Sequence, residues 1–281
     1  MNVIVKEITV RDYQTKSNLP ASDYVINPYV GCPHACKYCY ASFMKRFTGH
    51  TEEWGSFLDI KKCDKTVSKK KLEGKSLFLS SVTDCYNPYE KKYQITRSIL
   101  EQLVDIDCEI TISTKSNLIL RDVDLLKKIP HLKVAISLNT LNESFRKDMD
   151  NGSTVDERIE TLRQLHKAGL HTVLFMSPIF PHLTEWDKII DETKAFVKEY
   201  WFENLNLRGG YKTAILKYIA EIHPEIYTAY DKIYLQKDDS YWSELAELLE
   251  TYCKKEGISY TNYFYHKELV QDKMRMKKVV K

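Results

Sequence analysis

The sequence predicts an α/β fold, a partial (β/α)6 TIM-like barrel with a mostly helical C-terminal extension. Two observations lead to this prediction. Short apolar segments alternate with segments of helix length, and the pattern becomes mostly helical after residue 207. Helix-length connections between short strands imply a parallel sheet with right-handed crossovers. We count about six strands, too few for a closed eight-stranded barrel, so a partial barrel or an open sheet is expected.

Short apolar segments supply the predicted strands. In chain order they are residues 24–26, 77–79, 109–113, 132–137, 172–176 and 203–207. Helices are predicted between them at residues 93–104, 121–128, 155–168 and 185–198. The clearest is 155–168, where Val155 and Ile159 recur on one helix face, and Thr154 and Glu157 form a capping box at its start.

The chain is predicted to divide into a core at residues 15–207 and an extension at residues 208–281 that packs on the core. One helix at 241–253 and one strand at 258–264 are expected within the extension. The sequence shows no internal repeat and no low-complexity linker, so one large domain with an extension fits its length of 281 residues.

Composition favours a soluble, cytoplasmic protein with no membrane partner. The chain is 43% hydrophobic and 29% charged, and it contains no apolar run of membrane-spanning length. The first residues lack the apolar stretch of a signal peptide. The net charge of +3 is only mildly basic, and lysines gather at 69–71 and 273–281. Such runs are most often solvated faces, with a phosphate-rich partner as the alternative.

Three of the seven cysteines, Cys32, Cys36 and Cys39, follow the first strand with the spacing C-x3-C-x2-C. In a reducing compartment, clustered cysteines bind metal more often than they form disulfides. Three thiolates can hold a 4Fe–4S cluster by three of its irons, whereas electron-transfer clusters usually have four cysteine ligands. An open metal position is typical of sites that perform chemistry.

Polar residues stand after several of the other strands. They are Thr83 and Asp84 after the second, Lys115 after the third, Ser137 and Asn139 at and beyond the fourth, and Ser177 with Pro178 after the fifth. Each alone reads as an ordinary loop residue. Because the carboxyl ends of parallel strands meet at one rim, we expect these groups to converge there on a polar cofactor.

The cysteine motif, with Tyr38 inside its last gap, resembles the radical S-adenosylmethionine superfamily. Residues 27–41 (NPYVGCPHACKYCYA) resemble the branch that contains spore photoproduct lyase. Further segments resemble the same branch: 81–84 with Tyr86, Pro88 and Glu90, 113–116 with Arg121 and Asp122, 137–141 and 177–181. Within that branch, residues 41–47 and 204–209 look most like the "radical SAM mobile pair protein B" group.

The resemblance implies a function and a set of roles. Cys32, Cys36 and Cys39 would ligate the 4Fe–4S cluster, whose open iron binds the methionine end of S-adenosylmethionine. An electron from the reduced cluster, supplied by a flavodoxin- or ferredoxin-type donor, then generates a 5′-deoxyadenosyl radical that abstracts hydrogen from a substrate. Tyr38 would lie near the adenine. The other residues expected to contact S-adenosylmethionine are Tyr40, Thr83, Lys115, Ser137 and Asn139.

One departure from the resemblance concerns the substrate. In spore photoproduct lyase, a cysteine two residues before the Thr83 position returns hydrogen to the product radical, and this chain has Ser81 there. A serine O–H bond is too strong for that role, and Cys85 need not point into the same space. The substrate is therefore left open, with nucleic acids, peptides and small metabolites all possible and a DNA-repair lyase as the alternative. Specificity is expected in residues 43–76 and in the extension.

Two alternatives of another class remain. In the first, the chain is a non-catalytic module in which the three cysteines and a fourth ligand hold zinc. Their spacing differs from the paired ligands of common zinc sites. In the second, Cys63 completes a four-cysteine cluster that only carries electrons.

Overall fold

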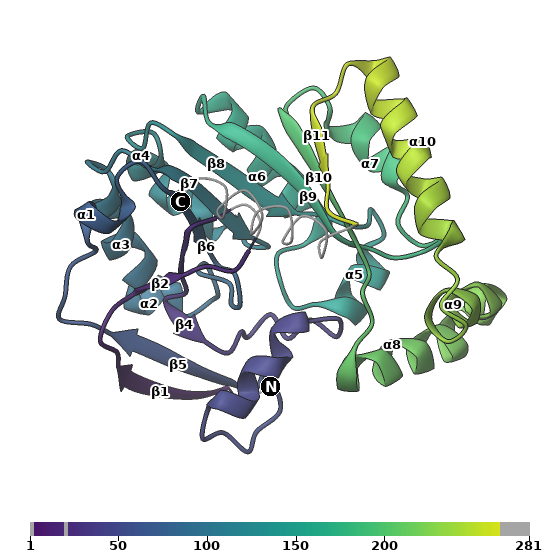
Figure 1. The fold of residues 1–281 in the computed structure, drawn as a ribbon, viewed down its shortest axis with the longest axis horizontal. Coiled ribbons are helices and arrows are strands. Elements are labelled where there is room, and N and C mark those ends of the chain that lie inside the picture. Colours follow the sequence, from purple (N-terminus) through teal and green to yellow (C-terminus); the bar gives the residue numbers. More distant parts are fainter. Residues whose placement is uncertain (1–2, 20–21, 265–281) are drawn as a thin grey trace, which may run out of the picture.

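The computed structural model describes residues 3–19 and 22–264. Its main sheet has eight strands in the order β11-β10-β9-β8-β7-β6-β3-β2 (Figure 1). Six of them run parallel in chain order: β3 (Tyr24–Ile26), β6 (Ser76–Leu79), β7 (Glu109–Thr114), β8 (Leu132–Ser137), β9 (His171–Ile179) and β10 (Glu199–Asn204). This sheet confirms the predicted α/β partial barrel.

The two remaining strands lie at the edges of the main sheet. β2 (Gln14–Lys16) pairs antiparallel with β3, and β11 (Tyr260–Asn262) pairs parallel with β10. The strand expected in the extension is therefore present, and it lengthens the core sheet. The lysine run at 273–281 lies outside the described residues.

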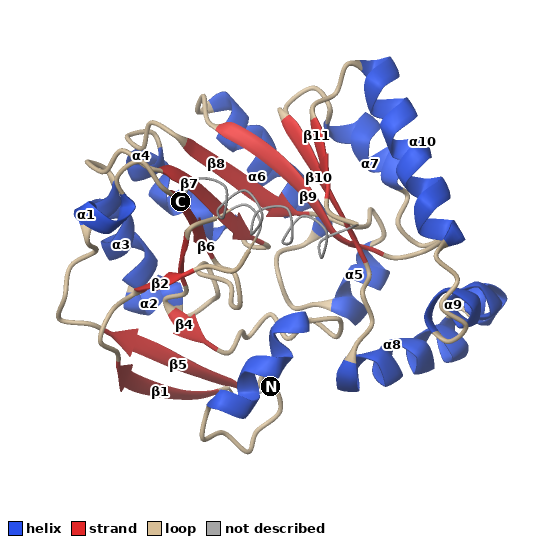
Figure 2. Cartoon of the chain, in the orientation of Figure 1, coloured by secondary structure: helices blue, strands red, loops and turns tan. Residues whose placement is uncertain are grey.

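Helices connect the parallel strands, as the alternating pattern predicted (Figure 2). They are α2 (Glu90–Tyr93), α3 (Ile95–Leu103), η2 (Asn117–Asp122), α4 (Val123–Leu126), α5 (Glu143–Met149), α6 (Val155–Lys167) and α7 (Trp186–Thr193). The capping box of α6 is present, with Thr154 and Glu157 each accepting a backbone N–H of the other. The predicted helix 121–128 is in fact the 3-10 helix η2 followed by the short helix α4.

Three predicted boundaries were wrong. The last core strand runs from 199 to 204 instead of 203 to 207, because the buried run Tyr200–Phe202 and the ion pair of Glu199 with Lys133 (2.6 Å) belong to it. Helix α7 ends at residue 193 instead of 198. Strand β9 extends to Ile179, so Ser177 and Pro178 lie within the strand rather than after it.

A second, three-stranded sheet lies apart from the main one, and the sequence pattern did not predict it. It joins β1 (Ile4–Thr9) in parallel to β5 (Phe57–Lys62), and β5 antiparallel to β4 (Tyr29–Val30). Short helices flank β5 in the chain: η1 (Tyr40–Phe47) precedes it and α1 (Lys69–Leu72) follows it. Because β4 leads directly into the cysteine segment, this sheet borders that segment.

The C-terminal part is mostly helical, as predicted. It contains α8 (Gly209–Ile222), η3 (Pro224–Ile226), α9 (Tyr227–Tyr234) and α10 (Ser240–Glu256), which group on the side of the molecule away from the small sheet (Figure 1). Tyr230 and Tyr234 fix α9 to the core by donating hydrogen bonds to the carbonyls of Pro181 (3.2 Å) and Leu205 (2.8 Å). Within the described chain, no helix is both long and apolar enough to cross a bilayer.

Gly31, the residue before the first cysteine, lies so close to the Phe57 backbone that we expect no other residue to fit there. Its φ is +86°, and a Cβ there would lie 2.3 Å from the Phe57 carbonyl oxygen. Gly74 also has a positive φ (+65°), but a Cβ there would meet nothing within 4 Å.

We predict that Gly74→Ala lowers the free energy of unfolding by about 1–2 kcal/mol, the cost of the left-handed backbone alone. Gly31→Ala should cost about 2–5 kcal/mol, because steric overlap with fixed backbone is added to it. Urea unfolding of both variants measures the difference, and equal losses would contradict the prediction.

Candidate active site

The three clustered cysteines occupy one loop that begins directly after β4. Cys32 is buried, Cys36 and Cys39 are half-buried, and all are free thiols. Burial raises the pKa of each thiol above its usual value. Neighbouring charges act on Cys36 in both directions, because Asp150 raises its pKa and Lys115 lowers it. A metal that binds here must therefore displace protons.

A buried carboxylate, Asp84, fixes the ends of two strands to the cysteine loop. Its Oδ1 accepts a hydrogen bond from the Thr114 hydroxyl (2.7 Å), and its Oδ2 accepts one from the Lys115 amide (2.9 Å). His34 Nδ1, between the first two cysteines, lies 3.2 Å from Oδ2, an ion-pair distance without good hydrogen-bond geometry. Burial alone would raise the pKa of Asp84, but His34 and the two hydrogen bonds lower it to about 2.

A second buried carboxylate, Asp150, holds the cysteine loop from the other side. It accepts hydrogen bonds from the Tyr38 hydroxyl (3.1 Å) and from the guanidinium of Arg158, which is 1% exposed. Burial would raise the pKa of Asp150, and the positive charges of Arg158 and Lys115 lower it. This pair keeps its charges in the interior, because each ion is neutralised by its partner.

Two backbone hydrogen bonds reinforce this second attachment. The Lys37 amide donates to the Met149 carbonyl (2.9 Å), and the Asn151 amide donates to the His34 carbonyl (2.7 Å). The cysteine loop is therefore clamped between the end of β6 and the segment that follows α5.

Lys115 brings a positive charge to the cysteine loop. Its ammonium is 5.6 Å from the centre of the Tyr38 ring, and its charge acts on Cys36. Tyr38 itself is buried, with its ring edge-on to Phe180 (5.4 Å). Lys115 and Tyr38 thus meet beside Cys36, as expected for a common site.

The other predicted residues contact neighbouring loops. The Thr83 hydroxyl donates to the Gly31 carbonyl (2.6 Å), and the Tyr40 hydroxyl donates to the Ser81 carbonyl. Asn139 donates through its side chain to the Pro178 carbonyl (3.0 Å).

Ser137 is buried, and its carbonyl accepts from Arg158 (3.2 Å). The predicted set therefore divides in two. Tyr38, Tyr40, Thr83 and Lys115 border the cysteine loop directly, while Ser137 and Asn139 lie at the end of β8 and join it to β9 and α6.

Sequence reasoning missed the residues that position this loop. Asp84 was noted at a strand end, but its partners Thr114 and His34 were not foreseen. Asp150 and Arg158 carry no motif, since nothing local marks an acid and a base eight residues apart as a buried pair. The hydrogen bond from Ser177 to Glu203 was also not foreseen, because Ser177 was predicted to follow its strand and Glu203 to begin one, whereas they lie in the last residues of the neighbouring strands β9 and β10.

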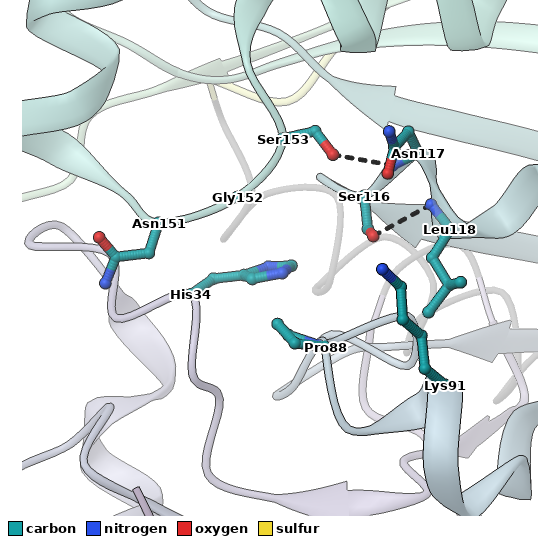
Figure 3. A pocket seen from close by; sticks show the side chains of 9 residues that line it. All are labelled: His34, Pro88, Lys91, Ser116, Asn117, Leu118, Asn151, Gly152 and Ser153. Atoms are coloured by element: carbon teal, nitrogen blue, oxygen red, sulfur yellow. Dashed lines mark hydrogen bonds between the residues drawn. The ribbon is translucent and has the colours of Figure 1, made fainter. Parts of the chain in front are cut away.

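A small cavity of about 180 Å³ reaches the cysteine loop at His34. It is lined by His34, Pro88, Lys91, Ser116, Asn117, Leu118, Asn151, Gly152 and Ser153. Figure 3 shows the His34 ring reaching across it toward Ser116 and Lys91. The cavity is smaller than the range of about 300–1,000 Å³ usual for ligand pockets.

The donor set fits a 4Fe–4S cluster. Three soft thiol ligands lie in one loop, each buried or half-buried, and their charges act on one another. Across residues 3–19 and 22–264, no three His, Cys, Asp or Glu side chains surround one common metal position. A cluster requires a wider arrangement than a single ion, because each thiolate binds a different iron.

We predict that Asp84→Asn costs less stability in acid than at neutral pH. The pKa of this carboxyl is about 2 in the folded protein and 3.8 in the unfolded chain. The stability that the ionised carboxylate contributes is therefore complete above pH 3.8 and is lost as the pH falls through 2. The difference in unfolding free energy from wild type should shrink by about 2 kcal/mol between pH 6 and pH 2. Urea unfolding without added iron measures it. Asp105→Asn, an exposed control, should show no such trend, and a constant difference for Asp84→Asn would contradict the prediction.

The fold is similar to those of two solved structures. It matches spore photoproduct lyase complexed with dinucleoside spore photoproduct with a TM-score of 0.56 and 15% identity, over 78% of this chain and 66% of that chain. It matches Streptococcus suis SuiB bound to S-adenosylmethionine with a TM-score of 0.52 and 14% identity, over 93% of this chain and 51% of that one. The chain thus spans just under two thirds of the lyase and about half of SuiB, and these identities establish similarity of fold alone.

Curated relatives are similar in sequence. An uncharacterized protein of Methanocaldococcus jannaschii is 39% identical over 213 residues, which is 75% of this chain and 80% of that protein. An uncharacterized protein of Acidianus two-tailed virus is 30% identical over 189 residues, 63% of this chain and 62% of that protein. Residues 26–193, more than half of the chain, match the model of the Radical SAM superfamily. The chain therefore belongs to the radical SAM superfamily of enzymes, whose members use a 4Fe–4S cluster and S-adenosylmethionine.

Proposed function

We propose that this radical SAM enzyme holds its cluster through Cys32, Cys36 and Cys39. The observation that carries the proposal is the double attachment of their loop, by His34 to Asp84 and by Tyr38 to Asp150. When bound, the cluster supplies the electron that cleaves S-adenosylmethionine. The chain contributes a fixed loop, so that its thiols meet the irons with little rearrangement.

Lys115 is proposed to bind the carboxylate of S-adenosylmethionine. Its ammonium lies 5.6 Å from the centre of the Tyr38 ring, and its positive charge lowers the pKa of Cys36. A charge-assisted bond to a carboxylate is stronger than a neutral hydrogen bond and orients the ligand. Tyr40, Thr83, Ser137 and Asn139 remain proposed contacts. Tyr40 and Thr83 border the cysteine loop as Lys115 does, and this position supports their role as contacts more directly than the positions of Ser137 and Asn139 support theirs.

The division of the chain into a core at 15–207 and an extension at 208–281 is also proposed. The family match over residues 26–193 supports the core. The extension packs on it through α8 and α9, and Tyr218 on α8 donates to Asp148 (2.8 Å) close to the Asp150 clamp. We infer that the extension forms one wall of the substrate space and contributes to specificity.

The substrate assignment follows from the Ser81 position. The Ser81 hydroxyl accepts a hydrogen bond from the side-chain amide of Asn27 (2.8 Å), and the Ser81 carbonyl accepts one from the Tyr40 hydroxyl. Cys85, the nearest thiol in sequence, is fully buried in the core. We propose a member of the spore photoproduct lyase-like branch, of the mobile pair protein B type, and the lack of an accessible thiol here supports a reaction other than dimer repair. DNA-repair lyase chemistry remains the alternative.

Radical SAM enzymes need a reductant. We propose an electron donor of the flavodoxin or ferredoxin type and a cytoplasmic location, where seven free cysteines remain reduced. A related phage protein, the radical SAM Nalpha-GlyT isomerase of Pseudomonas phage M6, is 24% identical over 164 residues, 58% of this chain and 34% of that protein. We propose a nucleic acid or a peptide as the substrate class.

We predict that Cys36→Ala abolishes both cluster assembly and cleavage of S-adenosylmethionine, because two thiolates cannot replace three. Anaerobic reconstitution should give about four irons and four sulfides per wild-type chain, and dithionite should then yield 5′-deoxyadenosine. Cys63→Ala is the matched control and should keep both properties. Loss of the cluster in Cys63→Ala would instead support a four-cysteine electron carrier, and zinc in place of iron would overturn the proposal.

We predict that Lys115→Met weakens binding of S-adenosylmethionine by roughly 10- to 100-fold, the loss of one charge-assisted bond of about 1.5–3 kcal/mol. Iron content should stay at the wild-type level, because Lys115 bonds Asp84 through its backbone amide. Isothermal titration measures the Kd, with exposed Lys127→Met as the control. An unchanged Kd in Lys115→Met would rule out the assigned role.

A further inference from the structure

The segment around Trp54 packs directly against the cysteine loop. Gly55 has a φ of +100°, and a Cβ there would lie 2.6 Å from the Cβ of Ala35, between the first two cysteines. A Cβ at Gly31 would lie 2.3 Å from the Phe57 carbonyl oxygen. Two glycines without room for a side chain therefore bring residues 54–57 into contact with the loop. This segment lies within 43–76, where sequence reasoning expected substrate specificity, and it borders the cluster site.

The orientation of Trp54 is fixed by its neighbours. Its indole stands edge-on to Phe57, with ring centres 5.7 Å apart and planes at 86°. His50 stacks on the Phe57 ring, with ring centres 3.9 Å apart, and its Nε2 lies 2.8 Å from the buried carboxylate of Asp59. Glu52 engages the second nitrogen of His50 at 2.9 Å. The indole is thus held by a packed and hydrogen-bonded group of side chains.

The indole N–H of Trp54 is buried, and it has no hydrogen-bond partner of good geometry among the described residues. Buried donors are nearly always paired, so an orphan of this kind calls for a missing acceptor. The neighbouring acceptor is Cys39. Its thiol lies within reach of the Trp54 N–H and of the backbone amide of Ala41. A neutral thiol accepts weakly, whereas an iron-bound thiolate accepts well.

We propose that Trp54 donates a hydrogen bond from Nε1 to Cys39 Sγ when Cys39 ligates the cluster, and that this bond raises the reduction potential of the cluster. The inference rests on the proposed function, because it requires Cys39 to be a ligand. Reduction adds one electron to the cluster, and no covalent bond forms or breaks. The added charge lies partly on the sulfur ligands, so an N–H donor stabilises the reduced state more than the oxidised state.

Trp54→Phe tests the proposal, because it keeps an aromatic ring and removes only the N–H and the second ring. Redox titration of the reconstituted protein, followed by electron paramagnetic resonance of the reduced cluster, gives the midpoint potential. We expect a more negative midpoint, with the ratio of reduced to oxidised cluster falling three- to tenfold at a fixed solution potential. A tenfold change corresponds to about 59 mV for a one-electron couple. Trp186→Phe, in α7, is the matched control and should titrate like wild type.

An unchanged or more positive midpoint in Trp54→Phe, at full iron content, overturns the proposal. A second measurement decides the case in which that variant loses its cluster. Wild-type protein labelled with 15N in its indole nitrogens should show a 15N hyperfine coupling in pulsed resonance of the reduced cluster. Trp186→Phe should retain the coupling.

Absence of this coupling in wild type, with the cluster present, overturns the role of Trp54 and leaves the proposed function intact. Failure of wild type to assemble a cluster at all would overturn both. The two failures are therefore distinguishable by iron content.

Discussion

The buried carboxylate of Asp84 is the contact on which the arrangement of this site depends. It lies at the end of β6, accepts hydrogen bonds from Thr114 and Lys115 at the end of β7, and lies beside His34 in the cysteine loop. A carboxylate kept charged in the interior needs all of these partners, because any missing partner leaves a buried charge uncompensated. The order of the sheet and the position of the loop are therefore set together.

The charges around the cysteine loop follow from this attachment. With the Lys115 backbone fixed by Asp84, its side chain extends to Tyr38 and Cys36, where Asp150 and Arg158 form a closed pair on the far side. Lys115 lowers the pKa of Cys36 and Asp150 raises it. The ammonium of Lys115 has no ion-pair partner at hydrogen-bond distance among the described residues, so its charge remains available to an anionic ligand.

The small sheet lies beside a third part of the cysteine loop, in addition to the Asp84 and Asp150 attachments. The segment 54–57, which leads into β5, packs against the loop, and it carries the buried N–H of Trp54. Exclusion of water and hydrogen bonds to sulfur are two of the means by which a protein sets the potential of a cluster. The N-terminal part of the chain thus borders the cysteine loop, and α8 of the extension also reaches it, with the Lys37 ammonium 5.1 Å from the centre of the Tyr218 ring.

The sequence by itself determined the cysteine loop and the alternation of strands and helices. Cys32, Cys36 and Cys39 stand within eight residues, and strand and helix periods are local properties that can be read from one segment at a time. It also placed Lys115 at a strand end. Only the tertiary structure decided what holds these residues, because Tyr38 meets Asp150 across 112 positions and Gly55 meets Ala35 through a sheet without a strong pattern of its own. Contacts of this kind arise from packing between distant segments, which leaves no periodic signal in the chain.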